Sequence, residues 1–148
     1  MLTDTLKALY KRDLDKLIWE MEAFSKEELL WQVPEGITNS SGNLCLHLVG
    51  NLNHFIGAQL GGTGYVRQRE LEFSQKDVPL AEMKQMVADT IEMIGETLDK
   101  LGPEDLEKEY PIVLWGSPMS TEFFLVHLAG HVDYHLGQVN HLRRILDA

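Results

Sequence analysis

The chain has 148 residues, about the length of one domain, and its 44% apolar and 24% charged residues are typical of a soluble globular protein. Its formal charge of -10 opposes phosphate backbones and anionic membranes, so neither nucleic acid nor a membrane is expected as a partner. The single cysteine, Cys45, excludes an internal disulfide and a cysteine-rich zinc site, and predicts a cytoplasmic protein in a reducing compartment.

Four segments have the apolar spacing of α-helices, and no segment shows the alternation of a β-strand. The first covers residues 2–24. The second covers residues 42–60, follows N-cap candidates at residues 39–41 and stops at Gly61 and Gly62. This second segment is apolar almost all the way round, which predicts a central, buried helix.

The third helical segment covers residues 80–101 and the fourth covers residues 121–146, with Ser120 as its predicted N-cap. The connections 61–79 and 102–120 are each about 19 residues long, and connections of that length are rarely structureless unless they are functional. Both contain aromatic residues, so we expect them to pack onto the helices. The pattern predicts an all-α, single-domain four-helix bundle in which long connections permit parallel neighbours.

Histidines are the most informative residues of the fourth helix. His127, His131 and His135 drift by only about 40° per step, so they form one stripe, which we expect to face the core. Two histidines four residues apart on a helix can bind one ion, whereas His127 and His135 are about 12 Å apart along the axis. The ligand pair is therefore 127 with 131, or 131 with 135.

The second helix carries a matching polar face, made by His47, Asn51 and His54. Burying such groups without partners costs roughly 1–3 kcal/mol each, so something must satisfy them. A metal ion held by the histidine pair of the fourth helix and a third histidine from this face would satisfy these groups. Three protein ligands leave one coordination position open, as in catalytic sites. A hydrogen-bonded polar core without metal is the alternative interpretation.

Two segments of the sequence, residues 127–146 and residues 43–73, resemble helices of a known superfamily. HLAGHVDYHLGQVNHLRRIL, residues 127–146, is similar to the last helix of the DinB-like superfamily of metal-binding four-helix bundles, with its His-x-x-x-His-x-x-Gln signature. NLCLHLVGNLNHFIGAQLGGTGYVRQRELEF, residues 43–73, resembles the second helix and following loop of that group. The similarity covers about residues 5–146 and implies an up-down-down-up bundle over residues 1–148, often a homodimer.

The resemblance also implies a divalent ion, with zinc or nickel expected and iron or manganese as alternatives. One histidine of the second helix and two of the fourth would hold it, and the best match is His47, His131 and His135; His54 in place of His47 stays open. The remaining polar residues are candidates to surround the ion or line a pocket: Asn51, His54, His127 and Gln138. Asn51 or Gln138 can accept the second ring N–H of a ligand histidine.

The function implied by the resemblance is a metal-dependent transferase that uses a small thiol and an electrophilic small molecule. A metal-dependent hydrolase is one alternative, and a non-catalytic metal-binding or structural dimer is another. A hydrolase needs a general base, and the histidine face of the fourth helix offers no carboxylate. Glu70 or Glu72, in the connection after the second helix, can fold over the site, but the sequence does not place them.

Overall fold

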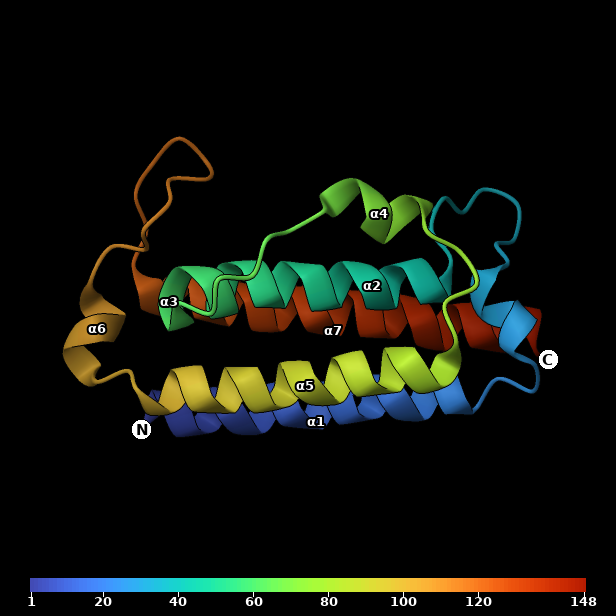
Figure 1. Cartoon of the computed structure of the whole chain (residues 1–148), viewed down its shortest axis with the longest axis horizontal. Coiled ribbons are helices and arrows are strands. Elements are labelled where there is room, and N and C mark those ends of the chain that lie inside the picture. Colours follow the sequence, from blue (N-terminus) through green and yellow to red (C-terminus); the bar gives the residue numbers. More distant parts are fainter.

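The computed structural model describes residues 1–148 and is all-helical, which confirms the predicted class. Four long helical segments make up most of it (Figure 1): α1 (Leu2–Glu22), α2 (Ser41–Leu52) with its continuation, α5 (Leu80–Asp99) and α7 (Thr121–Leu146). They match the predicted segments to within about two residues at most ends, which is the usual uncertainty of helix boundaries. None of them combines the length and the apolar character needed to cross a bilayer.

The second segment is a composite helix. α2 continues through a π-helical stretch, η2 (Asn53–Ala58), into the short α3 (Gln59–Gly61). Its start follows the predicted cap, because the Ser40 side chain accepts a hydrogen bond from the backbone N–H of Asn43 at 3.2 Å. Its end follows from Gly62, whose φ of 60° lies in the left-handed region that glycine adopts without strain. The π-helical stretch was not predicted from the sequence.

The four long segments lie side by side, with α1 packed on α5 and α7, and α2 packed on α5 and α7. In Figure 1, α1 and α7 run in one direction, whereas the α2–α3 segment and α5 run in the other. This arrangement is compatible with the predicted up-down-down-up bundle. The connection 61–79 makes the parallel pair of α2 and α5 possible, because it carries the chain back along the length of the bundle, whereas the connection 102–120 joins neighbouring ends of α5 and α7.

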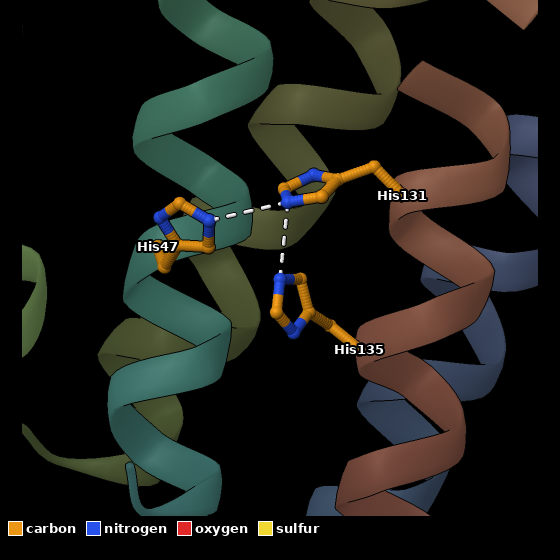
Figure 2. Close-up of side chains that lie close together, drawn as sticks. All are labelled: His47, His131 and His135. Carbon is orange, nitrogen blue, oxygen red and sulfur yellow. Dashed lines mark hydrogen bonds between the residues drawn. The ribbon is translucent and has the colours of Figure 1, made fainter. Parts of the chain in front are cut away.

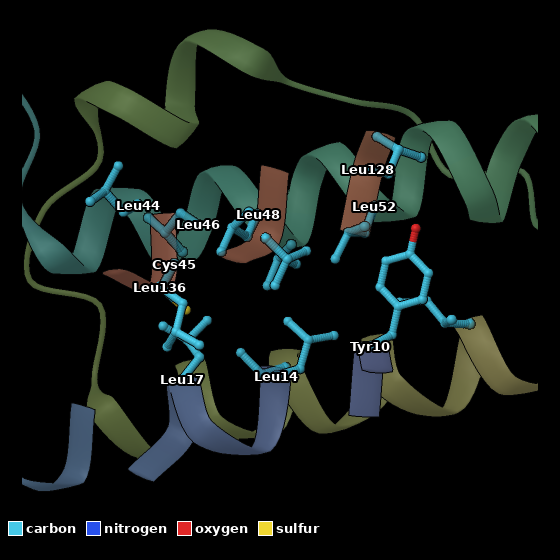
Figure 3. Close-up of a cluster of buried hydrophobic side chains, with 14 of the residues drawn as sticks. Tyr10, Leu14, Leu17, Leu44, Cys45, Leu46, Leu48, Leu52, Leu128 and Leu136 are labelled. Carbon is cyan, nitrogen blue, oxygen red and sulfur yellow. The ribbon is translucent and has the colours of Figure 1, made fainter. Parts of the chain in front are cut away.

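Leucine-rich faces of the helices meet in one hydrophobic core of 28 buried residues. Figure 3 shows Leu14 and Leu17 of α1 facing the leucines of α2, with Leu128 and Leu136 of α7 beside them. Every residue of α2 is buried, as its all-round apolar character predicts. Any polar side chain on α2 is therefore held in a largely water-free setting and needs a partner.

Hydrogen bonds between α1 and α7 fix the position of one helix along the other. The Tyr10 hydroxyl donates to the carbonyl oxygen of Leu125 at 2.6 Å. Ten residues further along α1, the buried carboxylate of Glu20 accepts from Asn140 at 2.6 Å and from Arg143 at 2.7 Å. A buried charge needs such partners. These contacts fix the position of α7 along the bundle axis, and therefore which part of α2 its histidines face.

The connections contain short helices that the sequence did not predict: η1 (Glu27–Trp31), α4 (Arg69–Ser74) and α6 (Pro103–Glu107). The one that matters for the site is α4, which lies over α2 (Figure 1). The buried side-chain amide of Asn43 anchors it by donating to the carbonyl oxygens of Glu72 at 3.0 Å and Gln75 at 2.9 Å. The expected packing of this connection onto the bundle is thereby explained.

Candidate metal centre

Three imidazole rings meet between α2 and α7 (Figure 2). His47 Nε2 lies 3.3 Å from His131 Nε2, which lies 3.0 Å from His135 Nε2. One ligand atom from each residue lies within 4.8 Å of the others. His47 is buried and the other two are half-buried, so these three residues, called the triad below, have limited contact with water.

The outer ring nitrogens of two triad members have acceptors that decide where their protons sit. His47 Nδ1 donates to the Glu72 carboxylate at 3.0 Å, and His135 Nδ1 donates to Gln138 Oε1 at 2.7 Å. Each neutral ring therefore carries its proton on Nδ1 and turns the lone pair of Nε2 toward the centre. Lone pairs that converge in this way repel one another unless a cation or a proton lies between them.

Two of the three nitrogen–nitrogen separations in the triad are close to those around a tetrahedral ion. A Zn–N bond of about 2.0–2.1 Å in tetrahedral geometry places two nitrogen ligands about 3.3–3.4 Å apart, close to the two separations in the triad. Burial lowers the pKa of His131, and the neighbouring His135 and His47 lower it further, to about 4. Burial also lowers the pKa of His135. Both rings are therefore neutral near pH 7, which is the form that binds metal.

Glu72 is the carboxylate that folds over the site, one of the two that the sequence left unplaced. It is buried and accepts two hydrogen bonds from Arg67, at 2.8 and 2.9 Å, in addition to the one from His47. Burial by itself raises the pKa of Glu72, but the hydrogen bonds from His47 and Arg67 outweigh it and hold the pKa below its usual range. The carboxylate is thus ionised and fully engaged, and it orients His47.

Gln138 and Asn51 were both candidates to accept a ring N–H, and they differ. Gln138 does so for His135. For Asn51 the prediction is wrong, because Glu72 takes that place beside His47 and the Asn51 side chain makes no hydrogen bond within the chain. Helical spacing puts Asn51 on the face of His47, but it does not show what α4 brings to that face.

His54 and His127 lie outside the triad. His54 falls at the start of the π-helical stretch, where the turn of α2 changes, and its ring packs against Phe55 with 4.7 Å between ring centroids. His127 is exposed, which contradicts the expectation that the whole stripe of α7 faces the core. Its ring lies edge-on to Trp115 at 4.7 Å, because the connection before α7, and not another helix, covers this end.

Two clefts border the triad. One, of about 320 Å³, is lined by His47 and His131 and by Asn51 and His127. The other, of about 400 Å³, is lined by His135 and Gln138 on the opposite side and contains no charged side chain. The triad therefore lies between two spaces that small molecules can enter.

The family model of DUF1572, described as a protein of unknown function, matches residues 2–148. The chain belongs to the DUF1572 family. No curated protein matches it. The family description assigns no activity.

Sequence reasoning missed two residues that build this DUF1572 site. Asn43 anchors α4, and Arg67 holds Glu72 from the connection before α4. The only sequence signal was that Asn43 shares a helical face with His47, four residues later. Nothing local marks Arg67, because its partner belongs to a different element.

Proposed function

We propose that this chain is a metal-dependent enzyme in which His47, His131 and His135 hold a divalent ion. The observation that carries the proposal is the convergence of three Nε2 atoms, two of them on rings whose Nδ1 protons are held by Glu72 and Gln138. Three protein ligands leave one position open, which is the pattern of catalytic sites. The resemblance to the DinB-like superfamily supports the same ligand set.

Zinc or nickel is the proposed ion, with iron or manganese as alternatives. Neutral imidazole suits zinc, copper, iron and nickel, whereas manganese prefers oxygen ligands, and the triad has none. Zinc in particular is bound by histidine nitrogens in tetrahedral sites. Metal analysis of protein purified without a histidine tag decides among them.

The proposed reaction transfers a small thiol to an electrophilic small molecule. When bound, the divalent ion lowers the pKa of a thiol and polarises an electrophile. The thiol proton goes to solvent, sulfur forms a bond to the electrophilic carbon, and the bond from that carbon to its leaving group breaks with its electron pair. Two clefts on opposite sides of the triad support a reaction of two substrates.

A metal-dependent hydrolase is supported less well. Such an enzyme needs a free general base beside the reacting water. Glu72 is the carboxylate at the triad, and both of its oxygens accept hydrogen bonds, from His47 and Arg67. Its role here is to orient His47, and this leaves it poorly placed to take a proton.

Metal binding is tested by counting zinc or nickel per chain after metal is added and excess removed. We expect about one equivalent for the wild type, a large loss for His135→Ala, and no loss for His141→Ala, an exposed histidine on the same helix. Equal metal content in the wild type and His135→Ala would reject the metal site, and the triad would then be a hydrogen-bonded polar core.

Transfer chemistry is tested by screening electrophiles with and without small thiols, using the zinc-loaded protein. Turnover that requires the thiol and is lost in His135→Ala supports the transferase. Turnover that is independent of thiol supports the hydrolase instead. A protein that binds metal stoichiometrically, gains stability and turns over nothing would be a structural metal site.

The resemblance further implies a homodimer in the cytoplasm, and we retain both as proposals. One outward face of α7 exposes Phe123, Val126 and Tyr134, which are large apolar side chains that a second copy can cover. Light scattering coupled to gel filtration measures the mass in solution. A mass of one chain at micromolar concentration would reject the dimer.

A further inference from the structure

The cleft beside His47 and His131 has a distinctive lining, and we call it the arginine cleft. Its walls come from α2, the α4 connection, the connection before α7 and α7 itself. Its volume of about 320 Å³ lies at the small end of the range for ligand pockets. A small molecule that fills it lies directly against two members of the triad.

The charge of the arginine cleft is opposite to that of the protein. The chain carries 23 acidic residues and a net charge of -10, yet no carboxylate side chain lines this cleft. Two arginines do, Arg67 and Arg69. Arg67 is neutralised by Glu72, whereas Arg69 makes no ion pair and has its guanidinium over the ring of Phe73 at 5.2 Å. The cleft therefore presents an unbalanced positive charge.

Asn51 provides a second, independent indication of a ligand. Its side chain is only 7% exposed, its Oδ1 atom is buried without a hydrogen-bond partner, and it lines the arginine cleft one turn after His47. An unsatisfied buried amide costs about 1–3 kcal/mol. The oxygen can accept only from a donor, whereas the NH2 of the same amide is the group that can donate to an anion in the cleft.

The remaining wall is aromatic. Trp115 is 56% exposed, lies edge-on to Phe124 at 5.8 Å and reaches His127 at the rim. Phe55, which lines the same cleft, packs against Phe124 at 5.2 Å. Flat rings of this kind stack on flat apolar ligands. The lining thus combines one cation, one hydrogen-bonding amide and an aromatic surface.

We propose that the arginine cleft binds a small organic anion with a flat apolar portion, as one substrate of the metal site. Its carboxylate or other anionic group contacts Arg69 and accepts a hydrogen bond from the side-chain NH2 of Asn51, and its apolar portion packs on Trp115, beside Phe55. The inference rests on the proposed function, because it assigns the chemical class of a substrate to the cleft beside the triad. The second cleft, which lacks charged residues, is left for the other reactant.

The test uses a matched pair of probes, benzoate and benzamide, which share the ring and differ in charge. Calorimetry with the zinc-loaded full chain is expected to show benzoate binding about tenfold more tightly, a difference worth about 1.4 kcal/mol. Arg69→Gln should weaken benzoate binding about fivefold to tenfold and leave benzamide unchanged. Arg144→Gln, which removes an exposed arginine from the far end of α7, is the matched control and should change neither.

A second variant, which leaves the net charge unchanged, distinguishes a specific contact in the cleft from a general effect of charge. Asn51→Leu keeps the volume and the charge of the chain, removes the amide, and should weaken both probes, because both can accept its hydrogen bond. Equal affinity for benzoate and benzamide, or unchanged benzoate binding in Arg69→Gln, would overturn the proposal. Loss in Arg144→Gln as large as in Arg69→Gln would also overturn it.

Metal content is measured on every sample, so that the two proposals can fail separately. Arg69→Gln and Asn51→Leu should retain one zinc per chain, because neither is a triad residue. Full zinc content with no saturable benzoate binding would reject the arginine cleft and leave the metal site standing. Charge-selective benzoate binding, lost in Arg69→Gln, in a protein that takes up no zinc would reject the metal site and retain the cleft.

Discussion

Glu72 illustrates how one residue outside the triad controls it. It accepts the hydrogen bond from His47 Nδ1, is itself held by Arg67, and comes from a different element than either helix of the triad. A carboxylate in this position keeps the ring in one tautomer and increases the basicity of its free nitrogen. The orientation and tautomer of His47 are therefore set by residues outside the triad.

Glu72→Gln is expected to weaken zinc binding about tenfold to a hundredfold, which is the usual cost of removing a group that orients a metal ligand. The amide can still accept from His47 but loses the ion pair with Arg67. Competition with a chromophoric chelator measures the affinity. Glu70→Gln, an exposed residue of the same short helix, should bind zinc as the wild type does, and an equal loss in both would contradict the role of Glu72.

Asn51→Leu is expected to leave the stability of the protein unchanged or to increase it. The wild-type amide is buried without a partner, and an apolar side chain of similar size removes that cost. Urea denaturation measures the free energy of unfolding. A loss of more than about 1 kcal/mol would show that Asn51 supports the fold and is not held for a ligand.

Among the elements, the docking of α4 on α2 decides whether the site forms. Asn43 ties the backbone of α4 down, Glu72 reaches from it to His47, and Gly50 of α2 leaves the space that the carboxylate occupies. A Cβ atom at Gly50 would overlap the Glu72 carboxylate, which is a backbone-to-side-chain fit that only glycine permits. The connection before α5 is thus part of the site.

Gly50→Ala is expected to displace Glu72, to destabilise the protein by about 1–3 kcal/mol through overpacking, and to weaken zinc binding. Gly130→Ala on α7 is the matched control, because the added Cβ meets open space. That substitution should stabilise the protein by about 0.5–1 kcal/mol through helix propensity. Thermal melts and chelator competition measure both, and equal behaviour of the two variants would contradict the fit at Gly50.

For the whole molecule, the triad joins two helices that are far apart in the chain. His47 and His131 are separated by 84 residues, so an ion between them stabilises only the folded state. Zinc at about a hundredfold excess over its dissociation constant should add about 2.7 kcal/mol. That corresponds to a rise in Tm of about 5–10 °C, and a chelator should reverse it. A similar rise in His135→Ala would place the stabilising ion elsewhere.

A second long-range contact, made by hydrogen bonds, joins the end of α7 to the end of α1. The Asp147 carboxylate accepts hydrogen bonds from the Ser25 hydroxyl and backbone N–H, both at 2.6 Å, and these lower the pKa of Asp147 below its usual 3.8. A carboxyl with a lowered pKa stabilises the fold above its unfolded-state pKa, and this stabilisation is lost as the pH falls through the folded-state value. The stabilisation from this contact is therefore smallest at acidic pH.

Asp147→Asn is expected to be less stable than the wild type near pH 7, and the difference should shrink as the pH falls below about 4. Urea midpoints at several pH values measure it. Asp15→Asn, which removes an exposed partner of Lys11 within one helix, serves as the control for a surface charge. A difference between wild type and Asp147→Asn that stays constant with pH would contradict the role of the ionised carboxylate.

The long helices and their ends could be predicted from the sequence because apolar spacing, caps and glycine stops act within a few residues. Local spacing also placed His131 with His135 as one possible pair, and the family resemblance added His47. The π-helical stretch and the short helices of the connections could not be predicted, since tertiary packing outweighs weak local preference there.

Only the tertiary structure decided which polar groups meet. Glu72 lies 25 residues from His47 in sequence, and no local pattern states that α4 folds back over α2. The exposure of His127, the unpaired amide of Asn51 and the positive charge of the arginine cleft are likewise decided by contacts between distant segments. Periodicity specifies the face on which a side chain lies, whereas the packing of separate elements specifies what that face contacts.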